Sequence, residues 1–443
     1  MLYDFSVEPD SLVLAQVTLL TSTPHGSMDG IQDVWYWIGL SLSHAHAIGL
    51  HLDIGENEDR SAKRKLRRRI WWCLFIRENV VAMGLGRPSR ITYYNVPMLS
   101  LSDFDSKILP YDVGIIPSQC PVARDLVAQQ ILAIILIEKA KLSVCVGRAV
   151  CVMCTIRDQT SKQSTMALPK ANMEAVGCAR ALEDWAAMLP MEAAYDPKPL
   201  SSYRLSERSL IAARAMLLMV YYDAICLLNR PLALRATSRG SADLSVSADE
   251  ARRLIRWAAS ELVKINTNLS ELDLLSYLDA TGVANVVAAV VVNLLDIKSE
   301  NERIRSTAVE ALQQCVKFLR IMKVTYGSAI AAYRFLETTL KSDGFPTLHT
   351  ENAPPADKAN KVQPADQLTS IFSPEDTVNG TTTTSVDMNG SVQSPQLQTQ
   401  LPSSVLGNHI WGDDFGMENW GLGDDQWMLP TFGTMDLPTT FNF

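Results

Sequence analysis

Apolar residues recur at spacings of three and four up to about residue 340, as expected for helices that bury one face. Polar residues lie between the apolar ones. Arg64, Arg68 and Glu78, for example, lie outside the apolar stripe that begins at Leu66. The spacing predicts helices rather than strands in this part of the chain. Two of the stripes are Trp35, Ile38, Leu42, Ala45 and Gly49, and Leu66, Ile70, Cys73, Arg77 and Val81.

Further helices are expected after residue 205. Ser206–Asn229 is apolar on nearly every side after a polar start that can cap it, a pattern typical of a buried helix. Arg230 and Pro231 are predicted to end this helix, because the residue before a proline is disfavoured in the helical region. Three more helices are expected over 251–262, 283–296 and 306–323. Alternating runs are few, so the predicted fold class is all-α, a multi-helix domain followed by a disordered C-terminal tail.

The composition changes after Lys341. Residues 343–405 are rich in Ser, Thr, Gln, Pro and Asn, which bury too little apolar surface to offset chain entropy, so this segment is predicted to be a disordered linker. Residues 406–443 differ again, because they hold seven aromatic and six acidic residues and no lysine or arginine. The predicted organisation is a helical domain over 1–342, a polar linker over 343–405 and an acidic aromatic tail over 406–443.

The net charge of −8 comes from this C-terminal part, which carries thirteen acidic residues and two lysines from Asp343 onward. The eight cysteines are scattered among apolar residues, which favours reduced core thiols in an intracellular protein over a disulfide framework. The first residues lack a signal-peptide pattern, and the longest uncharged apolar run, 280–295, is too short for a membrane span. We therefore expect a soluble protein with no membrane partner.

A run of six basic residues interrupted by Leu66 raises the question of nucleic-acid binding. The run continues without a break into the stripe of Leu66 and Ile70, so a helix with a solvated basic face is favoured over an arm that binds phosphates. A nuclear import signal also fits the composition, although importin reads such signals as extended chain. The run consists of Lys63, Arg64, Lys65, Arg67, Arg68 and Arg69.

Other candidate sites are weak. His44 and His51 are about 10 Å apart along a helix and His46 points elsewhere, so they are expected to be partly buried helix residues rather than metal ligands. Cys151 and Cys154 lie in an apolar run without a second cysteine pair, which favours core thiols over zinc. The segment 84–89, GLGRPS, follows a helix and is expected to end it at Gly86 rather than to bind a dinucleotide.

No nucleophile, phosphate-binding or metalloprotease motif is present, so we expect no catalytic residue, metal ligand or DNA-binding residue in this sequence, and no enzymatic function. The alternative class is an all-helical small-molecule-binding protein or enzyme, since a helical body of this size can hold a cavity.

A set of residues between Trp35 and Asp105 resembles the middle homology region of the fungal Zn2Cys6 transcription factors, also called the fungal-specific transcription factor domain. The likeness is closest to cutinase and acetamidase regulators, and weaker likenesses extend over 2–20 and 219–232. Leu99 and Ser100 depart from the acidic residue and proline that usually follow the family's Val-Pro. The matching residues, with an implied structural role, include Trp37, Gly39, His51, Arg69, Trp71, Trp72, Gly86, Arg87, Pro88 and Pro97.

The resemblance implies a nuclear regulator of genes read by RNA polymerase II, with metabolic or secondary-metabolite genes as expected targets. Family members usually begin with a six-cysteine zinc cluster, a linker and a dimerising coiled coil, none of which occurs in this sequence. We therefore expect zinc and DNA to be bound only by a module outside it or by a partner. A small-molecule effector and a homodimer are further expectations from the resemblance.

The tail is predicted to be an activation segment that binds the transcription machinery or a coactivator. Its acidic residues repel one another and keep the aromatic rings from collapsing together, so the rings stay available to a partner. The alternative is a tail that docks on its own helical domain or has no role. The rings expected to bind are Trp411, Phe415, Trp420, Trp427 and Phe432.

Overall fold

Short polar side chains begin several of the helices by accepting hydrogen bonds from the first free backbone N–H groups. Asp10, Asp33 and Asp279 each accept a bond from a backbone N–H two or three residues later. Asn301 accepts from two such groups. These four caps fix where the helices that begin at Ser11, Val34, Ala280 and Glu302 start, and the apolar stripes after them decide which face each helix buries.

The computed structural model describes residues 8–23, 33–53, 61–105, 121–161, 168–196, 207–234 and 242–342. Within these ranges it has helices and one isolated bridge between Leu52 and Asn95, so the predicted all-α class is confirmed. The α-helices are α1 Ser11–Thr21, α2 Val34–Ala47, α3 Ser61–Leu85, α4 Leu126–Ser161, α5 Leu168–Ala187, α6 Glu207–Leu234, α7 Ala242–Glu271, α8 Ala280–Asp296, α9 Glu302–Met322 and α10 Gly327–Ser342. Three 3-10 helices are η1 Leu101–Asp103, η3 Pro121–Arg124 and η5 Leu275–Tyr277.

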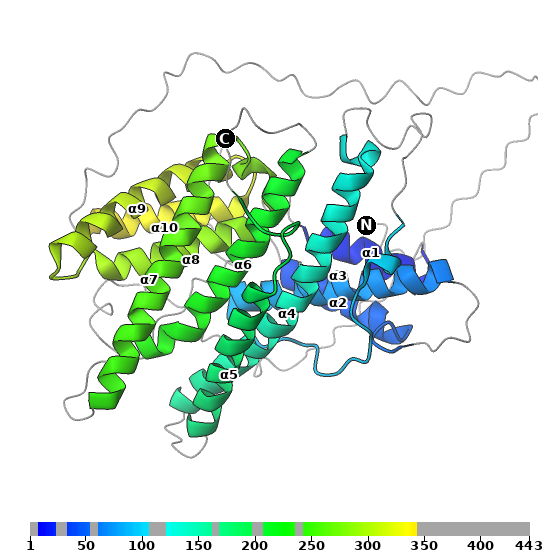
Figure 1. Ribbon diagram of the computed structural model, residues 1–443, viewed down its shortest axis with the longest axis horizontal. Coiled ribbons are helices and arrows are strands. Elements are labelled where there is room, and N and C mark those ends of the chain that lie inside the picture. The colour runs from blue at the N-terminus through cyan, green and yellow to red at the C-terminus, as the bar shows by residue number, and fades with distance from the viewer. Residues whose placement is uncertain are drawn as a thin grey trace, which may run out of the picture. The chain divides into compact units, whose positions relative to one another are not determined.

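The described helices form two groups that meet at α6. Helices α1 to α3 pack in succession, and α4 contacts α3, α5 and α6. Helices α7 to α10 pack in succession on the other side, and α6 contacts members of both groups, α3 to α5 and α7 and α8. Figure 1 shows α6 in green between the blue N-terminal helices and the α9 and α10 pair in yellow. The predicted linker over 343–405 and the predicted tail over 406–443 lie outside the described residues.

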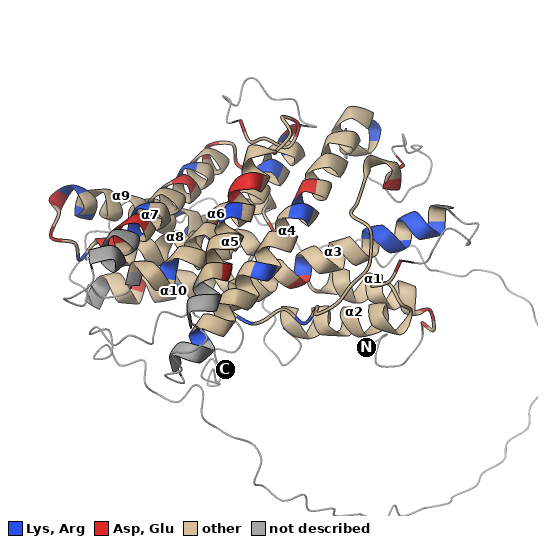
Figure 2. Ribbon diagram, turned by 60° about the horizontal axis from the view of Figure 1, so that its bottom comes forward, with Lys and Arg blue, Asp and Glu red and all other residues tan. Residues whose placement is uncertain are grey.

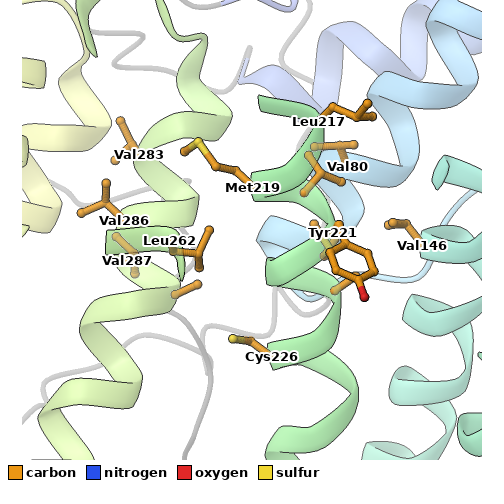
Figure 3. Close-up of a cluster of buried hydrophobic side chains, with 14 of the residues drawn as sticks. Val80, Val146, Leu217, Met219, Tyr221, Cys226, Leu262, Val283, Val286 and Val287 are labelled. Atoms are coloured by element: carbon orange, nitrogen blue, oxygen red, sulfur yellow. The ribbon is translucent and has the colours of Figure 1, made fainter. Parts of the chain in front are cut away.

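Helix α6 occupies the centre because it is apolar on nearly every side. Met219, Tyr221 and Cys226 of this helix are buried and belong to the core, together with Val80 of α3 and Val283 of α8 (Figure 3). The segment Glu207–Ala233 is long and apolar enough to cross a membrane by length and composition alone, and 67% of its most apolar window is buried inside the structure. Such burial is typical of the central helix of a bundle.

The predicted end of α6 at Arg230 is wrong, because the helix continues to Leu234 with Pro231 inside it. Proline disfavours this conformation locally by removing one hydrogen bond and crowding the preceding turn. Packing favours it, because Leu228 and Ala233 are buried on either side of Pro231. Arg252 Nε of α7 also donates to the Ala233 carbonyl at 2.9 Å, which satisfies one of the acceptors left at the helix end.

Candidate functional sites

The basic run of the sequence forms the first turns of α3, where Figure 2 shows Lys and Arg positions gathered in blue. Arg68 Nη1 donates to Asp103 Oδ1 at 2.9 Å, and Arg69 Nη1 donates to the Asp103 carbonyl at 2.8 Å. Arg67 Nη2 donates to the Ile48 carbonyl at 2.8 Å. The prediction of a solvated basic face is therefore wrong for these three arginines, because each guanidinium has an acceptor elsewhere in the fold.

The remaining basic residues of the run are less constrained. Lys65 Nζ lies 3.1 Å from Asp105 Oδ1 at a partly exposed position, Arg64 is half-buried and Lys63 is exposed. The run remains a predicted nuclear import signal. To be read as extended chain, Arg67 to Arg69 would have to leave both the helix and their acceptors.

Asp103 is positioned to accept hydrogen bonds from Arg68 and Arg69 because its own turn holds it in place. Its Oδ2 accepts from the Ser100 backbone N–H at 2.9 Å and from the Ser100 hydroxyl at 3.0 Å, which closes a capping box at η1. Ser100 is one of the two residues that depart from the family pattern. In this chain it supplies the cap that aims Asp103 at α3.

Arg68→Ala is expected to lower the free energy of unfolding by about 1 to 3 kcal/mol, the cost of leaving a buried polar group without its partner. The side chains of Arg68 and Asp103 are only 14% and 4% exposed. The measurement is urea unfolding followed by circular dichroism, and Lys63→Ala serves as the control because Lys63 is exposed on the same helix. Equal stability of the two variants would show that the basic run does not hold α3 to η1.

A buried ion pair lies further along α3. Glu78 is 0% exposed although it falls off the apolar stripe, and Arg90 surrounds its carboxylate. The Arg90 backbone N–H donates to Oε1 at 2.7 Å, and Arg90 Nη2 lies 2.6 Å from Oε2. Arg90 Nη1 donates to the Trp35 carbonyl at 2.9 Å, and Arg90 Cζ lies 3.7 Å from the centre of the Trp35 ring. The pair thus joins α2, α3 and the segment that follows α3.

The ion pair accounts for one glycine of the signature, Gly39, and the backbone conformation accounts for another, Gly86. A Cβ at Gly39 would overlap Arg90 Nη1, so a larger residue would displace the guanidinium from Glu78. Gly86 has φ +59, a conformation that glycine adopts without strain, and it ends α3 as predicted. Pro88 follows in the loop that leads to Arg90. The sequence signalled these positions through the resemblance, whereas nothing in the periodicity indicated Glu78 or Arg90.

The two tryptophans of the signature are both in the core. Trp71 and Trp72 are almost fully buried, and Trp72 Nε1 donates to the Pro97 carbonyl at 2.9 Å. Trp72 also meets the ring of Tyr94 edge to face at 5.8 Å. The segment after α3 therefore folds back along the helix, and the residues that carry the family likeness hold this layer together. They form a structural core rather than a reactive centre.

A groove of about 550 Å³ opens among α7, α8 and α9. At one end Arg256 of α7 holds Asp296 of α8 in a two-point pair, with Arg256 Nε 2.7 Å from Oδ2 and Nη2 2.7 Å from Oδ1. Arg303, in the first turn of α9, lines the same end. Lys264 and Glu310 line the groove about two helical turns further along. No motif in the sequence indicated this groove, because its residues come from three helices.

Comparison with known proteins shows what the chain is related to. Residues 1–187 match the model of the fungal specific transcription factor domain. Cutinase transcription factor 1 beta of Fusarium vanettenii is 32% identical over 355 residues, which cover 77% of this chain and 40% of the relative. The chain belongs to the family of fungal transcription factors. Transcription factor cpaR of Aspergillus oryzae is 27% identical over 317 residues, 68% of this chain and 51% of the relative. No solved structure matches the chain.

The chain spans between about a third and a half of the length of the curated relatives it matches. The match to the fungal-specific domain ends at residue 187, where α5 ends. Helices α6 to α10 therefore lie beyond the matched domain, although α6 packs against α3, α4 and α5. In this chain the matched domain and the helices after it share one hydrophobic core.

Arg77 connects these two parts of the chain. Its Nη2 donates to the Ser22 carbonyl at the end of α1 at 2.7 Å, and its Nη1 lies 3.6 Å from Asp279 Oδ2 at the start of α8. Burial raises the pKa of Asp279. The charges of Lys139 and Arg77 and the hydrogen bonds from Thr281 outweigh burial, so the net pKa of Asp279 is below its usual value. Asp279 is therefore a charged group that both caps α8 and binds α3.

His46 and the signature residue His51 lie differently from the prediction. Helix α2 ends at Ala47 and the chain turns at Gly49, φ +66, so that the rings of His46 and His51 lie 4.7 Å apart. The expectation that His46 points away from His51 is wrong for this reason. His46 is exposed, contrary to its predicted partial burial. Partial desolvation of its ring and the neighbouring His51 lower the pKa of His46, which favours its neutral form. Within the described ranges no group of three or more His, Cys, Asp or Glu residues is placed to hold a metal ion.

The cysteines suspected of binding zinc lie on α4. Cys151 is exposed and Cys154 is half-buried. Burial raises the pKa of the Cys154 thiol, and also that of Cys178 on α5, so both are expected to stay protonated. Zinc requires thiolates, and these positions offer no ligand set within the described part of the chain. Cys120 lies outside the described residues.

Proposed function

We propose that this chain is the regulatory and activation portion of a fungal transcription regulator that acts in the nucleus on genes read by RNA polymerase II. The observation that carries the proposal is the packing of the family signature, in which Arg90 and Glu78 join α2 to α3 and Trp72 holds the segment at Pro97. The relatives named above are transcription factors. The helical domain is proposed to control when the acidic aromatic tail reaches the transcription machinery.

The proposed partners follow from this division of roles. A coactivator or the transcription machinery binds the tail, and DNA is bound by a module outside this sequence or by a partner protein. Zinc belongs to that module, and the helical domain is proposed to act without a cofactor and as part of a homodimer. The family implies no enzymatic function, and the surfaces that join the signature residues are packed core rather than an open catalytic cleft.

The tail is proposed to work through its rings. Acidic residues, single or in pairs, lie between Trp411, Trp420 and Trp427 along 406–443. Mutual repulsion of the acids opposes collapse of the rings, and a hydrophobic groove on a partner then binds the rings in the manner of an amphipathic peptide. The charges maintain exposure, and the rings supply most of the binding energy.

The test fuses residues 406–443 to an unrelated DNA-binding domain and measures a reporter gene. The fusion is expected to drive the reporter, and alanine at Trp411, Phe415, Trp420 and Trp427 is expected to remove that activity. A second fusion that carries the full chain is expected to be less active than the tail alone, because the helical domain restrains the tail.

A matched control replaces the acids of the same segment by their amides. This variant keeps every ring and is expected to lose less activity than the variant without rings. A silent fusion, or one whose activity survives loss of the four rings, would contradict the proposed role of the tail.

A further inference from the structure

We infer that the groove among α7, α8 and α9 is a binding site for a small organic anion, a carboxylate with an apolar body. The groove encloses about 550 Å³, which falls within the usual range of about 300 to 1,000 Å³ for small-molecule sites. The inference deepens the proposed function, since the ligand would be the signal that the helical domain reads. The binding itself is tested on the purified chain.

Two guanidinium groups at one end of the groove supply the anion recognition. Asp296 occupies Nε and Nη2 of Arg256 and holds the guanidinium half-buried, with Arg256 35% and Asp296 11% exposed. Within the described residues, no hydrogen bond or ion pair engages Nη1 of Arg256. Arg256 is therefore oriented in advance and keeps donors for a carboxylate.

Arg303 adds an uncompensated charge to the same end. Its side chain has no hydrogen bond or ion pair in the part of the chain that the structure describes, and it lies in the first turn of α9. The carboxylate of the ligand is thus placed between Arg256 and Arg303.

The rest of the groove suits an apolar body that ends in a polar group. Val263, Val292, Ile304 and Ala308 also line the groove and supply apolar surface. Lys264 lies eight residues beyond Arg256 on α7, or about 12 Å along the helix. On α9, about two turns or more beyond Arg303, the carboxylate of Glu310 provides acceptors. The side-chain amides of Gln313 and Gln314 provide both donors and acceptors. This arrangement favours a ligand about 12 Å long, with a carboxylate at one end and a polar group at the other, over a short anion such as acetate or phosphate.

The test measures binding of decanoate and 4-phenylbutyrate to the purified full chain by isothermal titration calorimetry. Each carboxylate is compared with its primary amide, which has the same body without the charge. We expect the carboxylates to bind and the amides to bind about tenfold or more weakly, because the amide loses the charge-assisted bonds to arginine. Equal binding of acid and amide would overturn the assignment.

Variants locate the site. Arg303→Gln is expected to weaken carboxylate binding about tenfold or more while leaving the melting temperature unchanged, because Arg303 holds no other described residue. Lys317→Gln is the matched control, since Lys317 is exposed on α9 and does not line the groove, and it is expected to bind as the unaltered chain does. Thr307→Trp, which fills the groove, is expected to abolish binding. Unchanged binding in Arg303→Gln and Thr307→Trp would place the ligand elsewhere and refute the inference.

The acidic tail of the chain is the competing occupant. A full chain with alanine at Trp411, Phe415, Trp420 and Trp427 decides between the two. Equal carboxylate affinity with and without the four rings supports the small-molecule site. Binding that appears only when the rings are removed would assign the groove to the tail and overturn the inference. A silent reporter fusion bears on the tail alone, so failure of the proposed function is distinguishable from failure of this site.

Discussion

Trp72→Ala is expected to lower the free energy of unfolding by about 3 to 5 kcal/mol, the usual cost of removing a buried tryptophan ring from a packed core. The ring is 1% exposed and packs edge to face on Phe75 at 5.1 Å. Its Nε1 is also the donor that holds the Pro97 carbonyl at 2.9 Å. The substitution therefore leaves a cavity and at the same time releases the segment after α3.

Urea unfolding followed by circular dichroism measures this loss. Tyr93→Ala is the control, because Tyr93 is 63% exposed in the same region and its loss is expected to change stability by less than about 0.5 kcal/mol. Trp72→Phe keeps most of the ring volume without the donor and should fall between the two. If Trp72→Ala were as stable as Tyr93→Ala, the packing of α3 described above would be incorrect.

Asp223→Asn is expected to raise the free energy of unfolding by up to about 4 kcal/mol at pH 8. Asp223 lies on the central helix α6 and is almost fully buried. Burial raises the pKa of its carboxyl to about 7, and the charge of Arg230 offsets burial only in part. Above that pH the folded protein must keep a buried carboxylate, whereas asparagine has nearly the same shape and no charge.

The sign of the pH dependence follows from the raised pKa. An unfolded aspartate has a pKa of about 3.9, so between about pH 4 and pH 7 the folded state binds more protons at Asp223 than the unfolded state does. The contribution of Asp223 to the free energy of unfolding is therefore fully present below about pH 4 and is lost as the pH rises to about 7. The advantage of Asp223→Asn is expected to be small at pH 4, to grow through this window and to be constant above it.

The measurement is urea unfolding of both proteins at a series of pH values, with the difference between them taken at each pH. Asp184→Asn provides the control, because Asp184 is exposed on α5, and its difference from the unaltered chain is expected to stay flat. An advantage of Asp223→Asn that does not change between pH 4 and pH 8 would show that Asp223 does not titrate in the folded core.

The periodicity of the sequence was sufficient to predict the helical class and several elements in detail. Ile38, Leu42 and Ala45 of the first stripe are buried, as their spacing indicates, and Gly86 ends α3 in the predicted conformation. The family likeness also follows from the sequence alone, because it depends on the order and spacing of residues within one short segment. Local pattern determines local structure whenever the interactions concerned lie within a few turns of one helix.

Tertiary contacts decided what the pattern left open. The sequence placed Trp71 and Trp72 about 100° apart around a helix and did not require both to be core, yet both are buried because neighbours cover α3 on more than one side. Glu78 lies off the apolar stripe and is buried because Arg90, twelve residues later, folds back to neutralise it. Helix α6 continues past Arg230 because packing on both sides of Pro231 outweighs the local cost.

The groove is the clearest case of a feature that the sequence by itself could not determine. Arg256 and Asp296 are forty residues apart, and each alone reads as an ordinary polar position on an amphipathic helix. Periodicity tells which side of a helix is apolar, but it does not tell which helix will cover that side or which polar residues will meet across the gap. The sequence therefore determined the helices and the family of this protein, and the packing of α7, α8 and α9 determined where the groove and the proposed ligand site lie.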